Sequence, residues 1–161
     1  MVLENTEKKI VYINGDATSP LAAGVKIIGH ICNDVGGWGK GFVLAISKKW
    51  KEPKIQYKLW YNSKEKFGLG EVQFVQVEQY IYVANMIGQK GTKTGSKGPP
   101  IRYDAVESCL IKLAEKACEL NASVHIPRIG CGLAGGKWEN IEALLHKTLI
   151  SKGIDVFVYN F

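Results

Sequence analysis

Two glycine-rich segments are the places where this chain could do chemistry, and the chemistry they suit is anion binding. Residues 125–145 read HIPRIGCGLAGGKWENIEALL, and residues 29–45 read GHICNDVGGWGKGFVLA. In each, glycines stand between an apolar run and a segment of helical period. Glycine lets the backbone approach a ligand closely, and the first amides of a helix have no partner within it. Both segments therefore predict backbone N–H groups and a helix N-terminus directed at a phosphate.

The spacing of Gly130, Gly132 and Gly135 matches the dinucleotide pattern G-x-G-x-x-G. A Rossmann domain carries that pattern after its first strand, whereas only about 25 residues follow this one, so we exclude that fold. The nucleoside-triphosphate loop is excluded because Cys131 and Trp138 occupy the positions of its first glycine and of its Ser or Thr. The segment therefore predicts a diphosphate cradle without specifying the nucleotide.

The elements that must position these segments alternate along the chain. Runs rich in Val, Ile, Tyr and Phe predict six strands, at 9–14, 25–32, 71–77, 80–87, 123–127 and 155–161. Helical spacing of apolar residues predicts four helices, at 42–50, 54–62, 102–120 and 138–152. This order predicts an α/β layered fold with a largely parallel sheet, in which two neighbouring strands, at 71–77 and 80–87, form a hairpin. In such sheets, ligands bind beyond the carboxyl ends of the parallel strands.

The composition excludes several classes of protein. A chain of 161 residues fits one domain, which we assign to residues 1–161. No run of about 18 apolar residues is present, so we expect a cytoplasmic protein without a membrane partner. The four cysteines have no zinc-ligand spacing, so we expect reduced thiols and neither a metal nor a cofactor.

The formal net charge of +6 comes almost entirely from lysine. We interpret these lysines as a solvated surface spread along the chain, which is compatible with anionic ligands. A local concentration lies in GQKGTKTGSKGPP, residues 88–100, whose composition is typical of a loop. Binding of nucleic acid through this lysine-rich loop is the alternative that the charge leaves open.

The motifs, taken in order and spacing, resemble a macrodomain of the ADP-ribose-binding type. They are VYINGDAT, GHICNDVGGWGKGFVLAI, YIYVANMIGQ, PPIRYDAVESCL, PRIGCGLAGGKWENI and the final VFVYNF. The chain is especially similar to the branch with terminal ADP-ribose protein glycohydrolase and the ADP-ribose 1''-phosphate phosphatases. This resemblance covers nearly the whole chain and implies a three-layer α/β/α fold with a mixed, largely parallel six-stranded sheet.

The resemblance also implies which residues contact the ligand. Asp16 matches the acid that accepts a hydrogen bond from the adenine amino group, with the amide of Ala17 beside it, although Asn-Gly-Asp is also an ordinary turn sequence. Phe161 matches a terminal residue that flanks adenine; a core or fraying aromatic is the alternative. The loop around the distal ribose corresponds to Asn33, Gly37, Gly39 and Gly41, of which Asn33 could equally cap or turn the chain. The diphosphate loop corresponds to Gly130, Cys131, Gly132, Leu133, Ala134 and Gly135.

Hydrolysis of an ADP-ribosyl ester or of a 1''-phosphate would need acid and base groups beside the distal ribose. In the glycohydrolase that the chain resembles, a lysine after the Asn-Met-Ile strand attacks the ribose, and an acid in the Gly-Cys-Gly-Leu loop assists. Lys90 lies near the first place, whereas Ala134 holds the place of the acid and cannot transfer a proton. Asp34, which could orient water, and His30, as helper or structural histidine, are the substitutes that the sequence offers.

The sequence therefore predicts a protein that binds ADP-ribose or a derivative, either free or attached to a macromolecule. The candidate activity is hydrolysis of ADP-ribosyl esters or of ADP-ribose 1''-phosphate. A non-catalytic ADP-ribose reader and nucleic-acid binding through residues 88–100 are the alternatives, and the sequence leaves open whether the protein is an enzyme.

Overall fold

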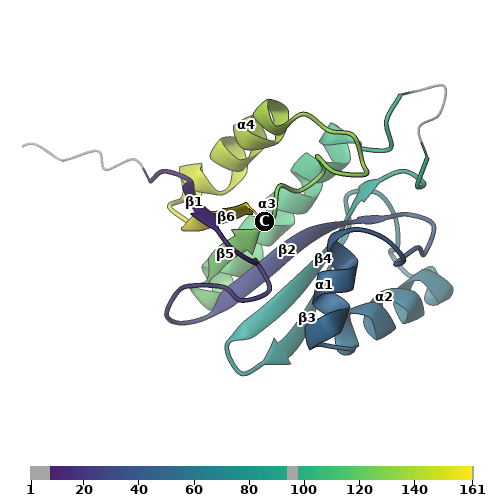
Figure 1. Ribbon diagram of the computed structural model, residues 1–161, viewed down its shortest axis with the longest axis horizontal. Helices are drawn as coiled ribbons and strands as arrows, with labels where there is room; N and C mark the ends of the chain where they lie inside the picture. The colour runs from purple at the N-terminus through teal and green to yellow at the C-terminus, as the bar shows by residue number, and fades with distance from the viewer. Residues whose placement is uncertain (1–7, 94–97, 161) are drawn as a thin grey trace, which may run out of the picture.

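The sheet places both glycine-rich segments at the same edge of the protein. The computed structural model describes residues 8–93 and 98–160, and these form a six-stranded sheet in the order β1-β6-β5-β2-β4-β3. All neighbouring strands run parallel except β3, which pairs with β4 in an antiparallel hairpin (Figure 1). The strands are β1 (Val11–Asn14), β2 (Lys26–Asn33), β3 (Val72–Glu78), β4 (Ile81–Gln89), β5 (Ser123–Ile126) and β6 (Val156–Asn160).

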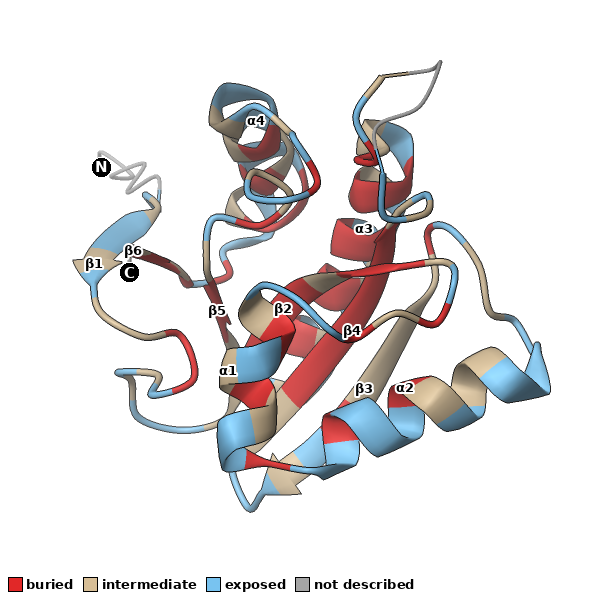
Figure 2. Cartoon of the chain, turned by 45° about the vertical axis from the view of Figure 1, so that its right-hand side comes forward, coloured by how far each residue is buried: buried red, intermediate tan, exposed pale blue. Residues whose placement is uncertain are grey.

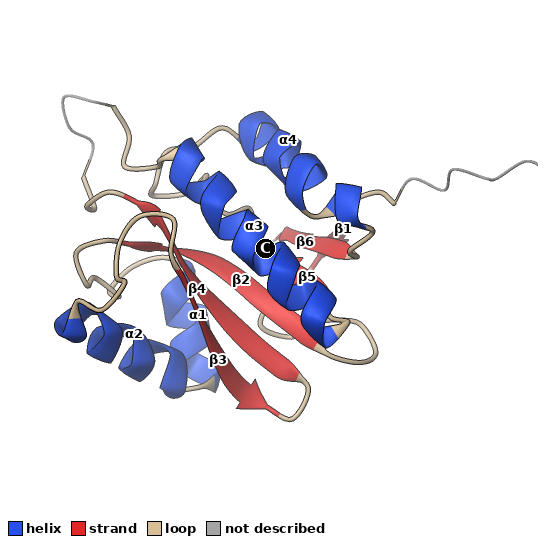
Figure 3. Cartoon of the chain, turned by 180° about the vertical axis from the view of Figure 1, so that it is seen from behind, coloured by secondary structure: helices blue, strands red, loops and turns tan. Residues whose placement is uncertain are grey.

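Helices cover both faces of the sheet and complete three layers. Helices α1 and α2 lie on one face, and α3 and α4 lie on the other (Figures 1 and 3). Pro53 stands in the first turn of α2, where its missing N–H costs nothing, so α2 begins at Glu52, two residues before the start that we predicted at residue 54. The helices of the described residues are α1 (Phe42–Lys49), α2 (Glu52–Ser63), α3 (Tyr103–Leu120), α4 (Trp138–Thr148) and a short 3-10 turn at Ile150–Lys152.

The sheet separates two hydrophobic cores, and its central strands are buried on both faces (Figure 2). The larger core lies under α3 and α4 and includes Leu110, Leu113 and Leu145, which are fully buried. The smaller core lies under α1 and α2 and includes Ile46 and Tyr57. Strand β2 contributes alternate side chains to the two cores, as a central strand must.

The fold predicted from sequence is confirmed, including the mixed, largely parallel sheet and the hairpin of β3 and β4. The helix predicted over 138–152 ends earlier, at Thr148, and continues as a 3-10 turn that stops at Gly153, whose φ is 75°. No helix within residues 8–93 or 98–160 is long and apolar enough to cross a bilayer.

Candidate functional site

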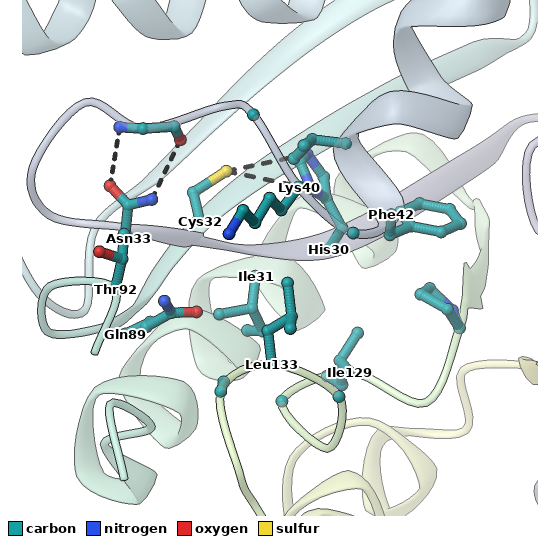
Figure 4. Close-up of a pocket in the computed structure, with 18 of the residues that line it drawn as sticks. His30, Ile31, Cys32, Asn33, Lys40, Phe42, Gln89, Thr92, Ile129 and Leu133 are labelled. Carbon is teal, nitrogen blue, oxygen red and sulfur yellow. Dashed lines mark hydrogen bonds between the residues drawn. The ribbon is translucent and has the colours of Figure 1, made fainter. Parts of the chain in front are cut away.

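A cavity of about 490 Å³ opens at the carboxyl ends of β2, β4 and β5, where the parallel-sheet rule predicts a ligand. Two segments form its walls: loop 1 (residues 34–41), which leads from β2 into α1, and loop 2 (residues 127–137), which leads from β5 into α4 (Figure 4). The volume lies within the range of small-molecule sites. Nine of the residues that we proposed for the site line it: His30, Asn33, Gly37, Gly39, Gly41, Gly130, Gly132, Leu133 and Ala134.

Asn33 shapes loop 1 from within. Its Oδ1 accepts hydrogen bonds from the N–H groups of Val35 and Gly37, at 3.0 and 2.9 Å, and its Nδ2 donates to the Gly37 carbonyl at 3.0 Å. The hydroxyl of Tyr57 lies 2.7 Å from the Asn33 carbonyl oxygen. The turn-forming role that the sequence left open is therefore the one seen, and Asn33 lines the cavity while holding the loop.

Trp38 anchors loop 1 to the smaller core. It is 4% exposed, its indole N–H donates to Ser47 Oγ at 2.8 Å, and its ring packs edge-on against His30 with the ring centres 5.3 Å apart. The indole is thus a wedge between loop 1 and the smaller core rather than a surface for a ribose.

The N-terminus of α1 faces the cavity without a side-chain cap. Gly41 is the capping residue, the first turn contains no acid, and Gly39, Lys40, Gly41, Phe42 and Val43 all line the cavity. Within the described chain, no protein acceptor pairs with the N–H groups of residues 39–41. Uncapped amides at a helix N-terminus attract a negative charge.

Loop 2 presents a second set of backbone donors. The N–H groups of Gly132, Leu133 and Ala134 have no acceptor among the residues that the structure describes. The loop is closed beneath them by hydrogen bonds from Gly136 N to Gly130 O, at 2.7 Å, and from Gly135 N to Gly132 O, at 3.0 Å. Consecutive backbone N–H groups in such a turn form an anion-binding concavity.

The glycines of the two loops fall into two groups. A Cβ on Gly136 would lie 2.4 Å from the carbonyl oxygen of Gly130, and one on Gly130 or Gly135 would lie 2.8 Å from Ile101 or Pro99. These three glycines are required by the packing of the chain on itself. Two others, Gly39 and Gly132, would meet nothing within 4 Å, although both line the cavity.

Cations surround the cavity and no acid lines it. Lys40, Lys93 and Arg128 are among its lining residues, which include neither Asp nor Glu within the described chain. Leu133, 66% exposed, projects from loop 2 toward loop 1, where a Cβ on Gly41 would lie 3.6 Å from its Cδ1 (Figure 4). The position of the cavity between the two loops and its lining cations therefore suit a ligand whose central part is anionic.

Arg128 is a lining residue that the sequence analysis did not single out. Its guanidinium carbon lies 5.1 Å from the ring centre of Tyr12 and 4.9 Å from that of Trp138, and its Nε donates to Asn160 Oδ1 at 2.8 Å. The Trp138 indole in turn donates to the Tyr12 hydroxyl at 3.1 Å. Cation–π contacts with the two rings hold the charge at the rim of the cavity, and no acid of the described residues forms an ion pair with it.

His30 lies on the floor of the cavity in a neutral, fixed form. Asn85 donates from Nδ2 to Pro53 O and Gln73 Oε1, so its Oδ1 accepts the proton of His30 Nε2, 2.6 Å away. Burial lowers the pKa of His30 to about 4, against a small opposing effect of Asn85. The imidazole is therefore uncharged at neutral pH, and its proton points away from the cavity.

The other two proposed catalytic residues do not line the cavity. The carboxylate of Asp34 accepts a hydrogen bond from Gly91 N at 2.7 Å, which ties loop 1 to the segment after β4. Lys90 is exposed, and its backbone N–H donates to Pro100 O. Thr92 and Lys93, two and three residues farther along, line the cavity instead.

The adenine-binding residues that we proposed lie beyond the limits of the cavity. Asp16 accepts hydrogen bonds at Oδ1 from the amide and hydroxyl of Thr18, at 2.8 and 2.7 Å, so the turn that we weighed for it is present. Ala17 is buried beside it, and Phe161 lies outside the described residues. In loop 2, Cys131 and Gly135 support the loop but do not line the cavity. Contact of these residues with a ligand stays a prediction.

The cysteines near the cavity are poor nucleophiles. Burial raises the pKa of the Cys32 thiol well above its usual range and raises that of Cys131 as well. Within the described parts of the chain, no cluster of His, Cys, Asp and Glu could hold a metal ion.

Comparison with solved structures decides the family. A Bacteroides thetaiotaomicron protein of unknown function is 62% identical, with a TM-score of 0.94 over 95% of this chain and 98% of that one. A macrodomain protein from Streptomyces coelicolor is 52% identical, with a TM-score of 0.86 over 95% of this chain and 99% of that one. The chain belongs to the macrodomain family. The family predicted from the sequence motifs is thereby confirmed.

Two curated relatives extend the comparison. The macrodomain is 34% identical over 161 residues to Chromodomain-helicase-DNA-binding protein 1-like of Danio rerio, matching 94% of this chain but 16% of that protein. It therefore spans about a sixth of that relative's length. An ADP-ribose 1''-phosphate phosphatase of Lodderomyces elongisporus is 28% identical over 158 residues, which cover 92% of this chain and 98% of the relative. No protein-family model matches the chain.

Proposed function

We propose that this macrodomain binds ADP-ribose, with the diphosphate held between loop 1 and loop 2. The observation that carries the proposal is the cavity itself: among the residues that the structure describes, both loops contribute backbone N–H groups without an acceptor, three cations line the cavity, and no carboxylate does. A diphosphate has two phosphate groups, so it can accept hydrogen bonds from both sets of amides. The relative named as an ADP-ribose 1''-phosphate phosphatase, matched over nearly its whole length, supports this choice of ligand.

The two ends of the ligand would then lie on opposite sides of the diphosphate. We propose that the distal ribose lies against Gly37 and Gly39 of loop 1, and that the adenine extends past Arg128 toward Asp16 and the amide of Ala17. One oxygen of Asp16 is occupied by Thr18, which fixes the orientation of the carboxylate. An oriented acceptor costs less entropy when it meets the adenine amino group.

A binding function fits the cavity better than a catalytic one. Hydrolysis requires proton transfer beside the distal ribose. Asp34 is engaged with Gly91, the proton of His30 points toward Asn85, and Ala134 supplies only a methyl group. Hydrolysis of ADP-ribose 1''-phosphate is the second candidate, because three relatives named as phosphatases of that compound match 86% or more of this chain.

Calorimetry with ADP-ribose, AMP and ribose 5-phosphate tests the binding proposal. We expect a micromolar dissociation constant for ADP-ribose, about −8 kcal/mol, and much weaker binding of the two fragments, each of which lacks the diphosphate. AMP binding as tightly as ADP-ribose would move the site away from the diphosphate loops. No binding of any of the three would refute the proposal.

Release of phosphate from ADP-ribose 1''-phosphate, and of ADP-ribose from an ADP-ribosylated acidic peptide, tests the second candidate. An enzyme would turn over one substrate and lose that turnover in Asp34→Ala or Lys90→Ala while still binding ADP-ribose. Absence of turnover in a wild type that binds ADP-ribose would assign the reader function.

A further inference from the structure

The excess positive charge of the protein lies in one layer of the fold. The chain contains 21 basic and 15 acidic residues, and residues 40–66, which span α1 and α2, contain 8 lysines and 2 glutamates. The remainder of the chain therefore has 13 of each sign and is neutral overall. We expected the lysines to be spread along the chain, and 11 of the 19 do lie outside residues 40–66; once the acids are counted, however, residues 40–66 carry a net charge of +6 and the remainder carries none.

The lysines of this layer are not neutralised by neighbouring acids. The four ion pairs of the described residues use Lys8, Lys112, Lys116 and Lys147, all of which lie outside residues 40–66. In contrast, Lys48, Lys51 and Lys54 are exposed and are paired with no carboxylate that the structure describes. A lysine without an acidic neighbour is not locally neutralised, so the fields of neighbouring lysines add within the screening length of the solution.

Three of these lysines lie along one side of α2, and one of them reaches loop 1 beside the cavity. Lys51, Lys54 and Lys58 are three and four residues apart, so they share one side of α2, which is about 18 Å long. Lys58 Nζ donates to the carbonyl of Gly36 in loop 1, which directs this side of α2 toward the glycine loop. Helices α1 and α2 lie next to each other on the same face of the sheet, with their outer sides exposed (Figure 2). We call this flank, with Lys48 of α1, the basic face.

We propose that the basic face binds the sugar-phosphate backbone of a nucleic acid. The face is broad and exposed, and neither cavity found in the described residues is lined by residues 44–63. A backbone of phosphates needs only unpaired cations along its path and no cavity, because most of its affinity comes from released counterions. It has no arginine, the side chain that most often reads bases, so the contacts carry no sequence preference.

An acidic protein partner fits the basic face less well. Such a partner needs a central apolar contact surrounded by charges. The exposed apolar side chains of this layer, Leu44, Ile55 and Leu59, are 47 to 57% exposed, and none of them lines either of the two cavities described in residues 8–93 and 98–160. Substituting them therefore separates the two kinds of partner, because phosphates gain nothing from apolar side chains.

Fluorescence anisotropy with labelled single-stranded and duplex oligonucleotides, measured over a range of salt concentrations, tests the proposal on the full chain. The variant Lys48→Ala/Lys51→Ala/Lys54→Ala should bind on the order of 10- to 100-fold more weakly at low salt, and the slope of log K against log salt should fall by about two to three. None of these lysines lines the cavity, so ADP-ribose binding of the variant should match the wild type.

A matched control removes the same charge elsewhere. Lys116→Ala/Lys147→Ala/Lys152→Ala changes the net charge equally on the layer of α3 and α4 and should leave oligonucleotide binding within about twofold. An equal loss in this control would show that total charge, and not the basic face, is responsible. A larger loss in Lys90→Ala/Lys93→Ala than in the basic-face variant would assign binding to the loop of residues 88–100 and overturn the proposal.

Two further outcomes would also overturn it. The first is a loss of oligonucleotide binding in Ile55→Ser/Leu59→Ser, because phosphates gain nothing from these apolar side chains. The second is tighter binding of a polyglutamate peptide than of an oligonucleotide at the same salt concentration. Either result would favour an acidic protein as the partner of the face. Failure of both oligonucleotides to bind at low salt would end the proposal directly. Because the oligonucleotides carry no ADP-ribose, these results do not depend on the proposed function of the cavity.

Discussion

The carboxylate of Asp34 lies 2.7 Å from the backbone nitrogen of Gly91, although the two residues are 57 positions apart. This hydrogen bond connects loop 1 to the segment that carries Thr92 and Lys93 into the cavity wall. Asp34 therefore has a structural role at the edge of the site, and substitutions can distinguish this role from a catalytic one.

Asp34→Asn should stay closer to the wild type in stability than Asp34→Ala. The asparagine amide keeps an oxygen that accepts from Gly91 N–H in a neutral hydrogen bond, whereas alanine loses the bond entirely, which with the charged carboxylate contributes about 1.5 to 3 kcal/mol. Thermal unfolding and ADP-ribose calorimetry on both variants measure the difference. If Asp34 were instead a catalytic base, any turnover would be lost equally in both, which would contradict the structural role.

Gly132→Val should weaken ADP-ribose binding without destabilising the protein. A Cβ on Gly132 would meet no atom within 4 Å, so the valine causes no clash in the protein. It would instead occupy the part of the cavity in which we propose that the diphosphate binds. We expect at least a tenfold loss of affinity, about 1.4 kcal/mol, and an unchanged melting temperature. Gly68→Val is the matched control, since its Cβ is also unobstructed and lies outside the cavity. Full affinity in Gly132→Val would refute the diphosphate site.

Gly136→Ala should show the opposite behaviour. A Cβ there would lie 2.4 Å from the carbonyl oxygen of Gly130, so loop 2 must deform. We expect a loss of about 1 to 3 kcal/mol in the free energy of unfolding, measured by denaturant titration. An unchanged stability would mean that loop 2 relaxes freely and is not pre-formed for its ligand.

The protein should lose stability as the pH falls from about 6.5 to about 4. Burial lowers the pKa values of His30 and His125 to about 4, whereas an unfolded histidine takes up its proton near pH 6.5. In this window the unfolded state binds more protons, so lowering the pH favours it, by roughly 3 kcal/mol for His30 by pH 4. The stabilising effect is fully present above pH 6.5.

Denaturant titrations at several pH values, on wild type and on His30→Gln, isolate the His30 contribution. The glutamine amide keeps a donor for Asn85 but does not titrate, so the pH dependence should become shallower. His146→Gln, at an exposed position on α4, should leave it unchanged. Parallel curves for His30→Gln and the wild type would show that His30 is protonated in the folded state.

Arg128→Ala should weaken ADP-ribose binding by about tenfold, and Arg128→Lys should lie between it and the wild type, because lysine keeps the charge but not the planar guanidinium that contacts the rings of Tyr12 and Trp138. Lys137→Ala removes the same charge from loop 2 outside the cavity and should have little effect. Calorimetry on the three variants provides the comparison. Equal losses in Arg128→Ala and Lys137→Ala would reduce the role of Arg128 to general electrostatics.

The sequence predicted the strands, the helices and the two glycine loops because each depends on local period or on glycine itself. It could not separate Gly132 from Gly136, since only the folded chain shows which glycine faces another backbone and which faces open space. It also missed Arg128, whose position depends on Tyr12 of β1 and Trp138 of α4, residues 126 positions apart. The structural role of Asp34 could not be predicted for the same reason, because it depends on the backbone amide of Gly91, 57 positions away.

The two walls of the cavity are anchored in different cores. Trp38 and Val43 of the loop 1 side pack under α1 and α2, whereas Ile129 and Ala134 of loop 2 pack under α3 and α4. A ligand that bonds to both loops acts as a cross-brace between two separately packed halves of the molecule. Binding of such a ligand therefore restrains the two helical layers relative to each other. The width of the cavity is then set by the packing on both faces of the sheet.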